Sequence, residues 1–95
     1  MDIKDFIQKN KEGIIYFKDP KCGPCKISDF SLKSLKEIRG IPLMVVNVNE
    51  DTDKEIVERF EVKAVPYVVF FKNGETLKMI TGAKSLRQYK ELLGE

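Results

Sequence analysis

The two cysteines of the chain, Cys22 and Cys25, lie three positions apart in the stretch DPKCGPCKIS. Thiols at this spacing can close a disulfide with each other or can serve as metal ligands. Zinc normally takes four Cys, His or carboxylate ligands, whereas this chain has two Cys and no His, so a metal would have to be shared with a second chain. A purely stabilising disulfide across so short a loop would contribute on the order of 2 kcal/mol. Reversible thiol–disulfide exchange is the chemistry that the pair favours.

The cysteines lie between a predicted strand and a predicted helix. IIYF, residues 14–17, is an unbroken run of β-branched and aromatic residues, typical of a strand that is buried on both faces. A helix is expected from Cys22 or Pro24 to about Arg39, because Pro24 fits the first turn of a helix and the apolar residues that follow have helical spacing. These apolar residues are Ile27, Phe30, Leu35 and Ile38.

This position gives the two cysteines different expected roles. A helix N-terminus has unpaired N–H groups and the positive end of the helix dipole, which stabilise a thiolate on Cys22. We therefore expect Cys22 to be the attacking thiol, with a pKa below the value of about 8.5 of a free cysteine. Cys25 follows one helical turn later, is directed toward the core, and is expected to resolve a mixed disulfide on Cys22. Gly23 and Pro24 form a tight, stiff turn that keeps the two sulfur atoms in register.

The elements on either side follow from apolar periodicity and capping signals. A helix is expected from Asp2, with Gly13 just past its end. A second buried strand covers residues 43–48. A short amphipathic helix follows the capping box of Thr52 and Glu55.

The C-terminal part of the chain predicts a hairpin. Asn73-Gly74 lies between two apolar runs, which indicates two antiparallel strands at about 67–72 and 75–80. In the second strand Leu77 and Met79 alternate with polar residues, as expected of a half-exposed edge strand.

A last helix begins with the capping box of Ser85 and Gln88. The complete order is helix, strand, helix, strand, helix, strand, strand, helix. Two strands joined by a helix imply a parallel pair with a right-handed crossover, and the hairpin extends the same sheet. The predicted fold class is α/β: a mixed four-stranded sheet, made of a parallel pair and a C-terminal antiparallel hairpin, with helices on both faces.

Length and composition restrict the classes of function. The 95 residues, 42% of them hydrophobic, are enough for one core, so a single domain over residues 1–95 is expected. The 17 Lys and Arg and the 15 Asp and Glu are interleaved and leave a net charge of +2, which argues against a nucleic-acid-binding surface. No apolar run approaches the ~20 residues of a membrane span, and the N-terminus has no apolar signal core. We expect a soluble, cytoplasmic monomer that binds neither nucleic acid nor membrane and uses no cofactor.

Several of these segments together resemble the thioredoxin family: CGPC at a strand-to-helix turn, then VPYVVFFKNGE and TGA. The resemblance extends from the IIYF strand to the last helix and implies a thioredoxin fold. It implies that Pro66 is in the cis form beside the cysteines and that the backbone of Val65 pairs with a bound substrate strand. Gly82 matches a glycine that lets a partner approach the same groove, to which Gly23 and Pro24 also belong. From the residues alone, Pro66 also fits an ordinary strand-edge proline and Gly82 a turn glycine.

The chain departs from the family pattern around the motif. Where thioredoxins carry W-A-x-W-C, this chain has KDPKC and no tryptophan, which predicts a different substrate surface. The buried aspartate that the family uses to shuttle a proton for the second cysteine is replaced by Tyr16, and its lysine partner by Val45. The proton of Cys25 must then move by way of water, Tyr16 or another carboxylate, such as Asp19 or Asp29. From residue types alone, Tyr16 also fits a core aromatic, Asp19 a turn residue and Asp29 a solvated helix face.

The resemblance implies a thiol–disulfide oxidoreductase that reduces protein disulfides through a reversible Cys22–Cys25 dithiol and is itself reduced by a flavoprotein thioredoxin reductase. A glutaredoxin-like protein reduced by glutathione is an alternative, although glutaredoxins usually have C-P-Y-C and T-V-P where this chain has CGPC and AVP. A second alternative is a binding module that holds a partner in the groove around Cys22, Val65 and Pro66 without redox turnover.

Overall fold

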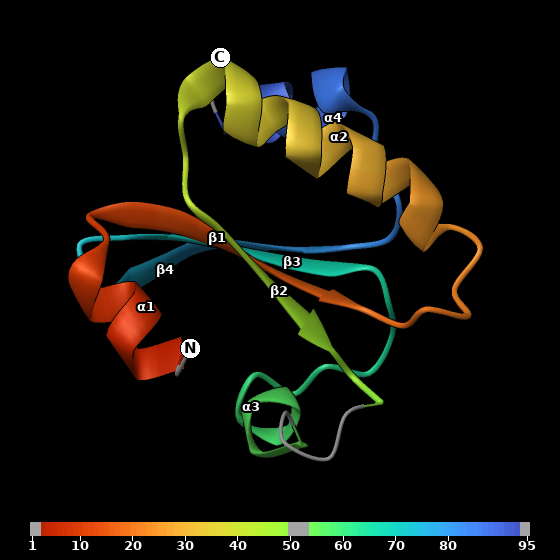
Figure 1. Cartoon of the computed structure of the whole chain (residues 1–95), viewed down its shortest axis with the longest axis horizontal. Coiled ribbons are helices and arrows are strands. Elements are labelled where there is room, and N and C mark those ends of the chain that lie inside the picture. The colour runs from red at the N-terminus through yellow and green to blue at the C-terminus, as the bar shows by residue number, and fades with distance from the viewer. Residues whose placement is uncertain (1–2, 50–53, 94–95) are drawn as a thin grey trace.

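The computed structural model describes residues 3–49 and 54–93, and the strands in this part of the chain form a four-stranded sheet. In spatial order the strands are β2 (Leu43–Asn47), β1 (Glu12–Lys18), β3 (Tyr67–Lys72) and β4 (Glu75–Thr81) (Figure 1). β2 runs parallel to β1, β3 is antiparallel to β1, and β4 is antiparallel to β3. The predicted mixed sheet, with a parallel pair and a C-terminal hairpin, is confirmed.

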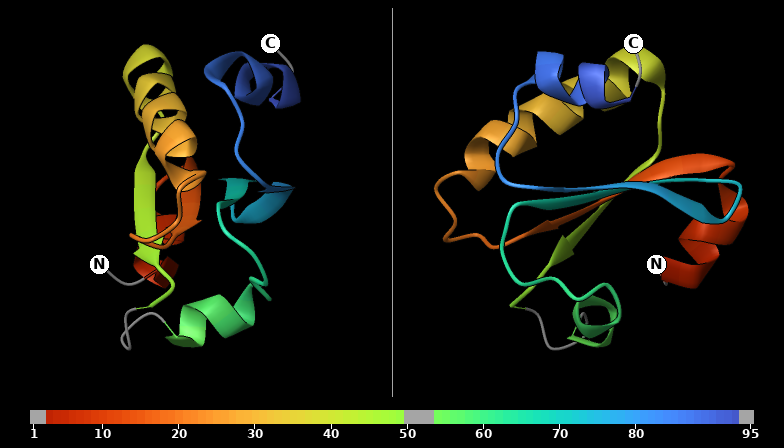
Figure 2. Two further views of the ribbon diagram at one scale, coloured as in Figure 1. Left: turned by 90° about the vertical axis from the view of Figure 1, so that its right-hand side faces the viewer. Right: turned by 180° about the vertical axis from the view of Figure 1, so that it is seen from behind.

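Helices cover both faces of the sheet, as predicted. The helices are α1 (Ile3–Lys9), α2 (Cys25–Arg39), α3 (Lys54–Arg59) and α4 (Leu86–Leu92). α2 and α4 lie on one face, and α1 and α3 lie on the other (Figure 2). Because side chains alternate along a strand, Ile14 and Tyr16 of β1 belong to the core under α2 and α4, whereas Ile15 and Phe17 belong to the core on the opposite face. The central strand β1 therefore supplies both cores.

Two predicted local signals have the expected geometry. Ser85 caps α4 with a complete capping box: its hydroxyl accepts the N–H of Gln88, and the Gln88 side chain accepts the N–H of Ser85. Asn73 and Gly74, both with positive φ, form the tight turn between β3 and β4.

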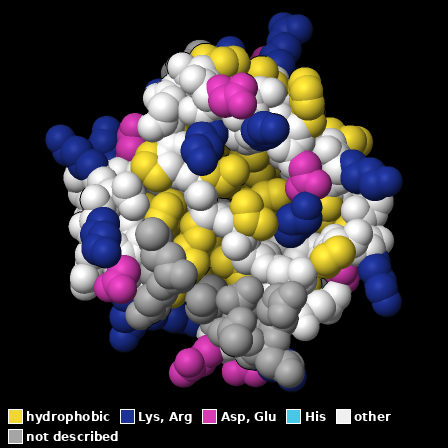
Figure 3. All heavy atoms as spheres, viewed as in Figure 1, with side chains coloured by type: hydrophobic (Ala, Val, Ile, Leu, Met, Phe, Trp, Pro, Cys, Tyr) yellow, Lys and Arg dark blue, Asp and Glu magenta, His cyan; other side chains and the backbone are white. Residues whose placement is uncertain are grey.

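The buried face of α2 differs from the one that the apolar spacing indicates. Ile27, Phe30 and Ile38 are 56%, 73% and 59% exposed. Figure 3 shows hydrophobic side chains on the surface along this helix. The α2 residues that are buried are Cys25, Ser28, Ser31, Leu32 and Leu35.

Two serines lie on the buried face of α2 because α4 and the segment before it supply their hydrogen-bond partners. The hydroxyl of Ser28 is 2.9 Å from the hydroxyl of Tyr89, and the hydroxyl of Ser31 donates to the carbonyl oxygen of Lys84 at 2.8 Å. A buried hydroxyl is tolerated when it is hydrogen-bonded. These contacts bury Ser28 and Ser31 beside Leu32 and Leu35, and three of the four apolar residues of the predicted stripe are left exposed.

Both edge strands are more exposed than the sequence predicts. β2 is an edge strand and not a buried one, and its Val45 is exposed. β4 is the predicted edge strand, but Leu77 and Met79 are both exposed. The register of β3 and β4 shifts between Phe70 and Phe71, which leaves Leu77 without an opposite residue and interrupts the alternation.

Gly13 lies inside β1 and not just past the first helix, so this expectation is wrong. A Cβ atom at this position would come within 2.7 Å of the ring of Phe71, which explains why a residue without a side chain occupies the strand here. The predicted helix start at Asp2 and the capping box that begins at Thr52 lie outside the described residues.

The buried face of α2 can be tested by stability measurements. Leu32→Ala removes a fully buried side chain and should lower the free energy of unfolding by about 2–5 kcal/mol. Phe30→Ala removes a larger side chain that is mostly in solvent, and its effect should stay within about 0.5 kcal/mol. Urea denaturation of the two variants and the wild type measures both values. Equal destabilisation by the two substitutions would contradict the described orientation of the helix.

Candidate active site

The loop that carries the cysteines connects the end of β1 at Lys18 to the start of α2 at Cys25, and Asp19 shapes it. The Asp19 carboxylate accepts the N–H of Lys21 at 2.9 Å, and the Asp19 main-chain carbonyl accepts the N–H of Cys22 at 2.9 Å. A short acidic side chain commonly stabilises a turn in this way. Asp19 is therefore the turn residue that holds Cys22 at the start of the helix.

Cys22 and Cys25 form a disulfide, and their Cα atoms are 5.3 Å apart. Cys25 is 1% exposed, whereas Cys22 is half-buried, so Cys22 is the more accessible of the two. The main-chain N–H of Cys25 points at Sγ of Cys22, with nitrogen and sulfur 3.1 Å apart. The N-terminus of α2 therefore faces Cys22, as predicted from the sequence.

Gly23 and Pro24 are exposed next to the disulfide. Pro24 has helical φ and ψ, and its carbonyl accepts the N–H of Ile27 at 3.2 Å. Pro24 thus belongs to the beginning of the helix, where its missing N–H costs no hydrogen bond. No atom lies within 4 Å of the position where a side chain of Gly23 would start, so this side of the disulfide is open.

Val65, Pro66 and Gly82 lie at the same end of the sheet as the cysteine loop. Tyr67, the first residue of β3, pairs with Phe17 near the end of β1, and Pro66 directly precedes it. The Val65–Pro66 peptide bond is cis, as the family resemblance implies. The carbonyl of Pro66 accepts the N–H of Gly82 at 2.9 Å, and Gly82 has a φ of +95°, which favours glycine.

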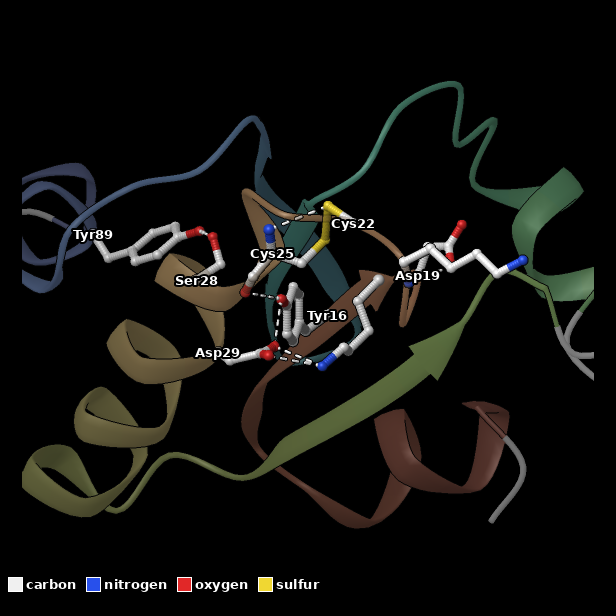
Figure 4. The surroundings of a disulfide bond; sticks show 9 residues. Tyr16, Asp19, Cys22, Cys25, Ser28, Asp29 and Tyr89 are labelled. Carbon is white, nitrogen blue, oxygen red and sulfur yellow. Dashed lines mark hydrogen bonds and ion pairs between the residues drawn. A yellow bond between two sulfur atoms is a disulfide. The ribbon is translucent and has the colours of Figure 1, made fainter.

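Tyr16 connects β1 to the first turn of α2. Its hydroxyl lies 2.9 Å from the carbonyl oxygen of Cys25 and 2.7 Å from Oδ1 of Asp29, and Figure 4 shows Tyr16 between these two residues. The Nζ atom of Lys18 is 2.8 Å from each carboxylate oxygen of Asp29 and 5.9 Å from the centre of the Tyr16 ring. Burial, and next the hydrogen bond to Asp29, raise the pKa of the Tyr16 phenol far above its usual range. Tyr16 is therefore a neutral hydrogen-bonding group at physiological pH.

These contacts resolve two assignments that residue types left open. Tyr16 is a core aromatic and also hydrogen-bonds at the site, and Asp29 is half-buried in an ion pair instead of lying on a solvated helix face. Sequence reasoning did not single out Lys18. Its position two residues after Tyr16 puts it on the same face of β1, and Asp29, four residues after Cys25, lies on the same side of α2.

Two further findings concern residues 3–49 and 54–93. This part of the chain contains no cluster of three or more His, Cys, Asp or Glu side chains that could hold a metal ion. None of its helices is long and apolar enough to cross a membrane.

Comparisons with known proteins agree with this geometry. The family model Thioredoxin matches residues 2–95. The chain is 34% identical over 80 residues to thioredoxin from Mycobacterium tuberculosis strain H37Rv, covering 84% of this chain and 69% of that protein. It is 31% identical over 80 residues to the bifunctional thioredoxin reductase/thioredoxin of Mycobacterium leprae, covering 84% of this chain and 18% of that protein. The crystal structure of oxidised mitochondrial thioredoxin 3 from Saccharomyces cerevisiae has a TM-score of 0.82 at 28% identity, covering 96% of this chain and 85% of that one.

The family match extends over almost the whole sequence, and it includes the strand-to-helix turn that carries the disulfide. The order and direction of the strands fit the same fold. This chain therefore belongs to the thioredoxin family, and it is a thiol–disulfide oxidoreductase with Cys22 and Cys25 as its redox-active pair.

Proposed function

We propose that this protein reduces disulfides in other proteins, with Cys22 as the attacking thiol and Cys25 as the resolving thiol, and that a flavoprotein thioredoxin reductase reduces it in turn. One observation carries the division of roles: Cys22 is half-buried and accepts an N–H from the first turn of α2, whereas Cys25 is buried beside it. An accessible sulfur at a helix N-terminus favours attack, and a neighbouring buried sulfur favours intramolecular release.

In the proposed cycle, two successive exchange steps reduce one substrate disulfide to two thiols. The Cys22 thiolate attacks a substrate disulfide, a bond forms between Cys22 and one substrate sulfur, and the other substrate sulfur leaves as a thiolate that takes up a proton. Cys25 then loses its proton and attacks Sγ of Cys22. The Cys22–Cys25 disulfide forms, and the second substrate sulfur leaves and is protonated. Two electrons and two protons have passed to the substrate, and the disulfide of the structure is the oxidised end of the cycle.

The proposed substrate-binding groove lies around the disulfide and consists of Gly23, Pro24, Val65, Pro66 and Gly82; the side chain of Pro66 is buried, and the other four residues are exposed or half-buried. Within the described part of the chain, neither backbone group of Val65 has a hydrogen-bond partner. An extended substrate segment can therefore pair with Val65 in the manner of an added strand. Gly23 and Gly82 leave room for such a segment, since neither has a side chain.

Two further properties belong to the same proposal. The M. leprae relative carries thioredoxin reductase and thioredoxin in one chain by its name, which supports a reductase of that kind as the electron donor here. A dithiol that must return to the reduced state suits a compartment that keeps thiols reduced, and we place the protein in the cytoplasm as a monomer.

Single substitutions separate the roles of the two cysteines. Cys22→Ser should abolish the reduction of insulin, used as a model disulfide substrate, because no attacking thiol remains. Cys25→Ser should accumulate a mixed disulfide between Cys22 and insulin, because the resolving thiol is missing. Mass spectrometry under non-reducing conditions detects this adduct. The double variant Cys22→Ser, Cys25→Ser forms no adduct and is the control.

Wild-type turnover by Cys25→Ser would contradict the resolving role. Full cellular function of the double variant would support a binding module without redox turnover.

The thiolate at the helix N-terminus predicts a pH profile. In reduced Cys25→Ser, alkylation of Cys22 by iodoacetamide should be half-maximal below the pH of about 8.5 that is typical of a free cysteine. The reason is that the N-terminus of α2 favours the charged form of the sulfur. A synthetic peptide of residues 19–28 with the same Ser substitution lacks the folded helix and is the reference. An identical profile in the peptide and the protein would remove the basis for assigning Cys22 as the nucleophile.

The electron donor can be identified by comparing two reducing systems. We expect turnover with NADPH and a thioredoxin reductase to be at least about tenfold faster than with glutathione and glutathione reductase, a difference of about 1.4 kcal/mol in the activation barrier. The measurement is NADPH oxidation in the presence of insulin. Cys22→Ser controls for reduction of insulin by the reductases alone. Turnover with glutathione only would favour the glutaredoxin-like alternative.

A further inference from the structure

A cluster of one phenol, one carboxylate and one ammonium group lies against the first turn of α2, next to Cys25. Asp29 follows Cys25 by four residues on α2, so the two side chains lie one above the other on the same side of the helix. Tyr16 and Lys18 are two residues apart on β1 and both contact Asp29. The cluster is thus fixed from two elements.

The Tyr16 hydroxyl has two acceptors within hydrogen-bond distance, the carbonyl oxygen of Cys25 at 2.9 Å and Oδ1 of Asp29 at 2.7 Å. The hydroxyl carries one proton, so the ionised carboxylate competes with the Cys25 carbonyl for it. A change in the charge of Asp29 therefore alters the hydrogen bond that the backbone of Cys25 receives. This is a direct route by which Asp29 acts on the residue that contains the resolving thiol.

The ion pair also acts on the thiol by its charges. The side chains of Lys18 and Asp29 are 26% and 39% exposed, so the pair is partly in solvent, whereas Cys25, whose carbonyl the same Tyr16 hydroxyl contacts, is buried. A nearby carboxylate disfavours a thiolate, and a nearby ammonium group favours it. Other titratable groups near the cluster are Lys26 and Lys33 on α2, next to Cys25 and one turn after Asp29. Asp19 and Lys21 lie in the loop, where Asp19 accepts the N–H of Lys21, and Tyr89 of α4 pairs with Ser28.

We propose that Asp29, held by Lys18 and Tyr16, is a positioning residue that sets how readily the thiol of Cys25 gives up its proton. This proposal rests on the proposed resolving role of Cys25. In the resolving step the S–H bond of Cys25 breaks, its proton passes to solvent, and the Cys25–Cys22 bond forms as the Cys22–substrate bond breaks. The departing substrate sulfur keeps the electron pair and takes up a proton.

Removing the negative charge of Asp29 and removing the positive charge of Lys18 should have opposite effects on the dithiol–disulfide equilibrium. A merely structural role of the ion pair predicts no such difference in sign. Asp29→Asn leaves Lys18 unbalanced, stabilises the thiolate form, and should shift the dithiol–disulfide equilibrium with glutathione toward the dithiol by at least threefold, about 14 mV. Lys18→Gln leaves Asp29 unbalanced and should shift the equilibrium toward the disulfide by a similar factor. In a Cys22→Ser background, Asp29→Asn should lower the pH of half-maximal alkylation of Cys25, and Lys18→Gln should raise it.

Matched controls separate a local effect from a general one. Glu37→Gln and Lys36→Gln change the same charges at exposed positions near the other end of the same helix and should shift the equilibrium less than 1.5-fold, about a quarter of a kcal/mol. Asp29→Glu keeps the charge and should stay near the wild type, which also shows that the position tolerates substitution. Circular dichroism of every variant establishes that it is folded.

Shifts of the same sign in Asp29→Asn and Lys18→Gln, or shifts no larger than those of the controls, would overturn this proposal. A failure of this proposal can be distinguished from a failure of the proposed resolving role of Cys25. If Cys25 did not resolve the mixed disulfide, Cys25→Ser would reduce insulin as fast as the wild type. The redox equilibrium and the alkylation profile of Cys25 are measured without any protein substrate.

Discussion

The packing of the first turn of α2 onto the end of β1 is the constraint on which the rest of the site depends. It buries Cys25, leaves Cys22 accessible and directs the helix N-terminus at the Cys22 sulfur. Tyr16 hydrogen-bonds from β1 to this turn, and Ser28 fixes the next turn against α4. If the helix started a few residues earlier or later, both the chemistry of the sulfur atoms and the position of the buried cluster would change together.

The sequence allowed the elements and the topology to be predicted because their signals are local. The capping box at Ser85 and the turn at Asn73-Gly74 each lie within a few residues. The orientation of α2 was not predictable in this way, because Ser28 is buried by Tyr89, 61 residues later in the sequence. The apolar stripe that includes Phe30 does not by itself identify the buried face of the helix, because hydrogen-bond partners on distant elements can bury polar side chains instead.

The same distinction applies to the site. The motif CGPC at a strand-to-helix turn was enough to predict the cysteine pair, and to predict that Cys22 is more exposed than Cys25. The ion pair of Lys18 and Asp29 could not be predicted from the sequence, because it depends on how closely a strand and a helix approach each other. Tyr16 lies on β1 and the carboxylate that it contacts, Asp29, lies on α2. A contact between two elements does not follow from a position-by-position comparison of sequences, and it becomes visible only when the two elements are packed.

The alternation of β1 between two cores has a consequence for how this family member can diverge. Tyr16 points to the redox side of the sheet, while Ile15 and Phe17 point to the opposite side. An insertion or deletion of one residue in β1 would exchange these sides and place the phenol in the wrong layer. A change in chain length that preserves this alternation is therefore expected in the loops and not within β1. The layer under α1 and α3 is also tied to the site, because Val65 of the proposed groove packs against it.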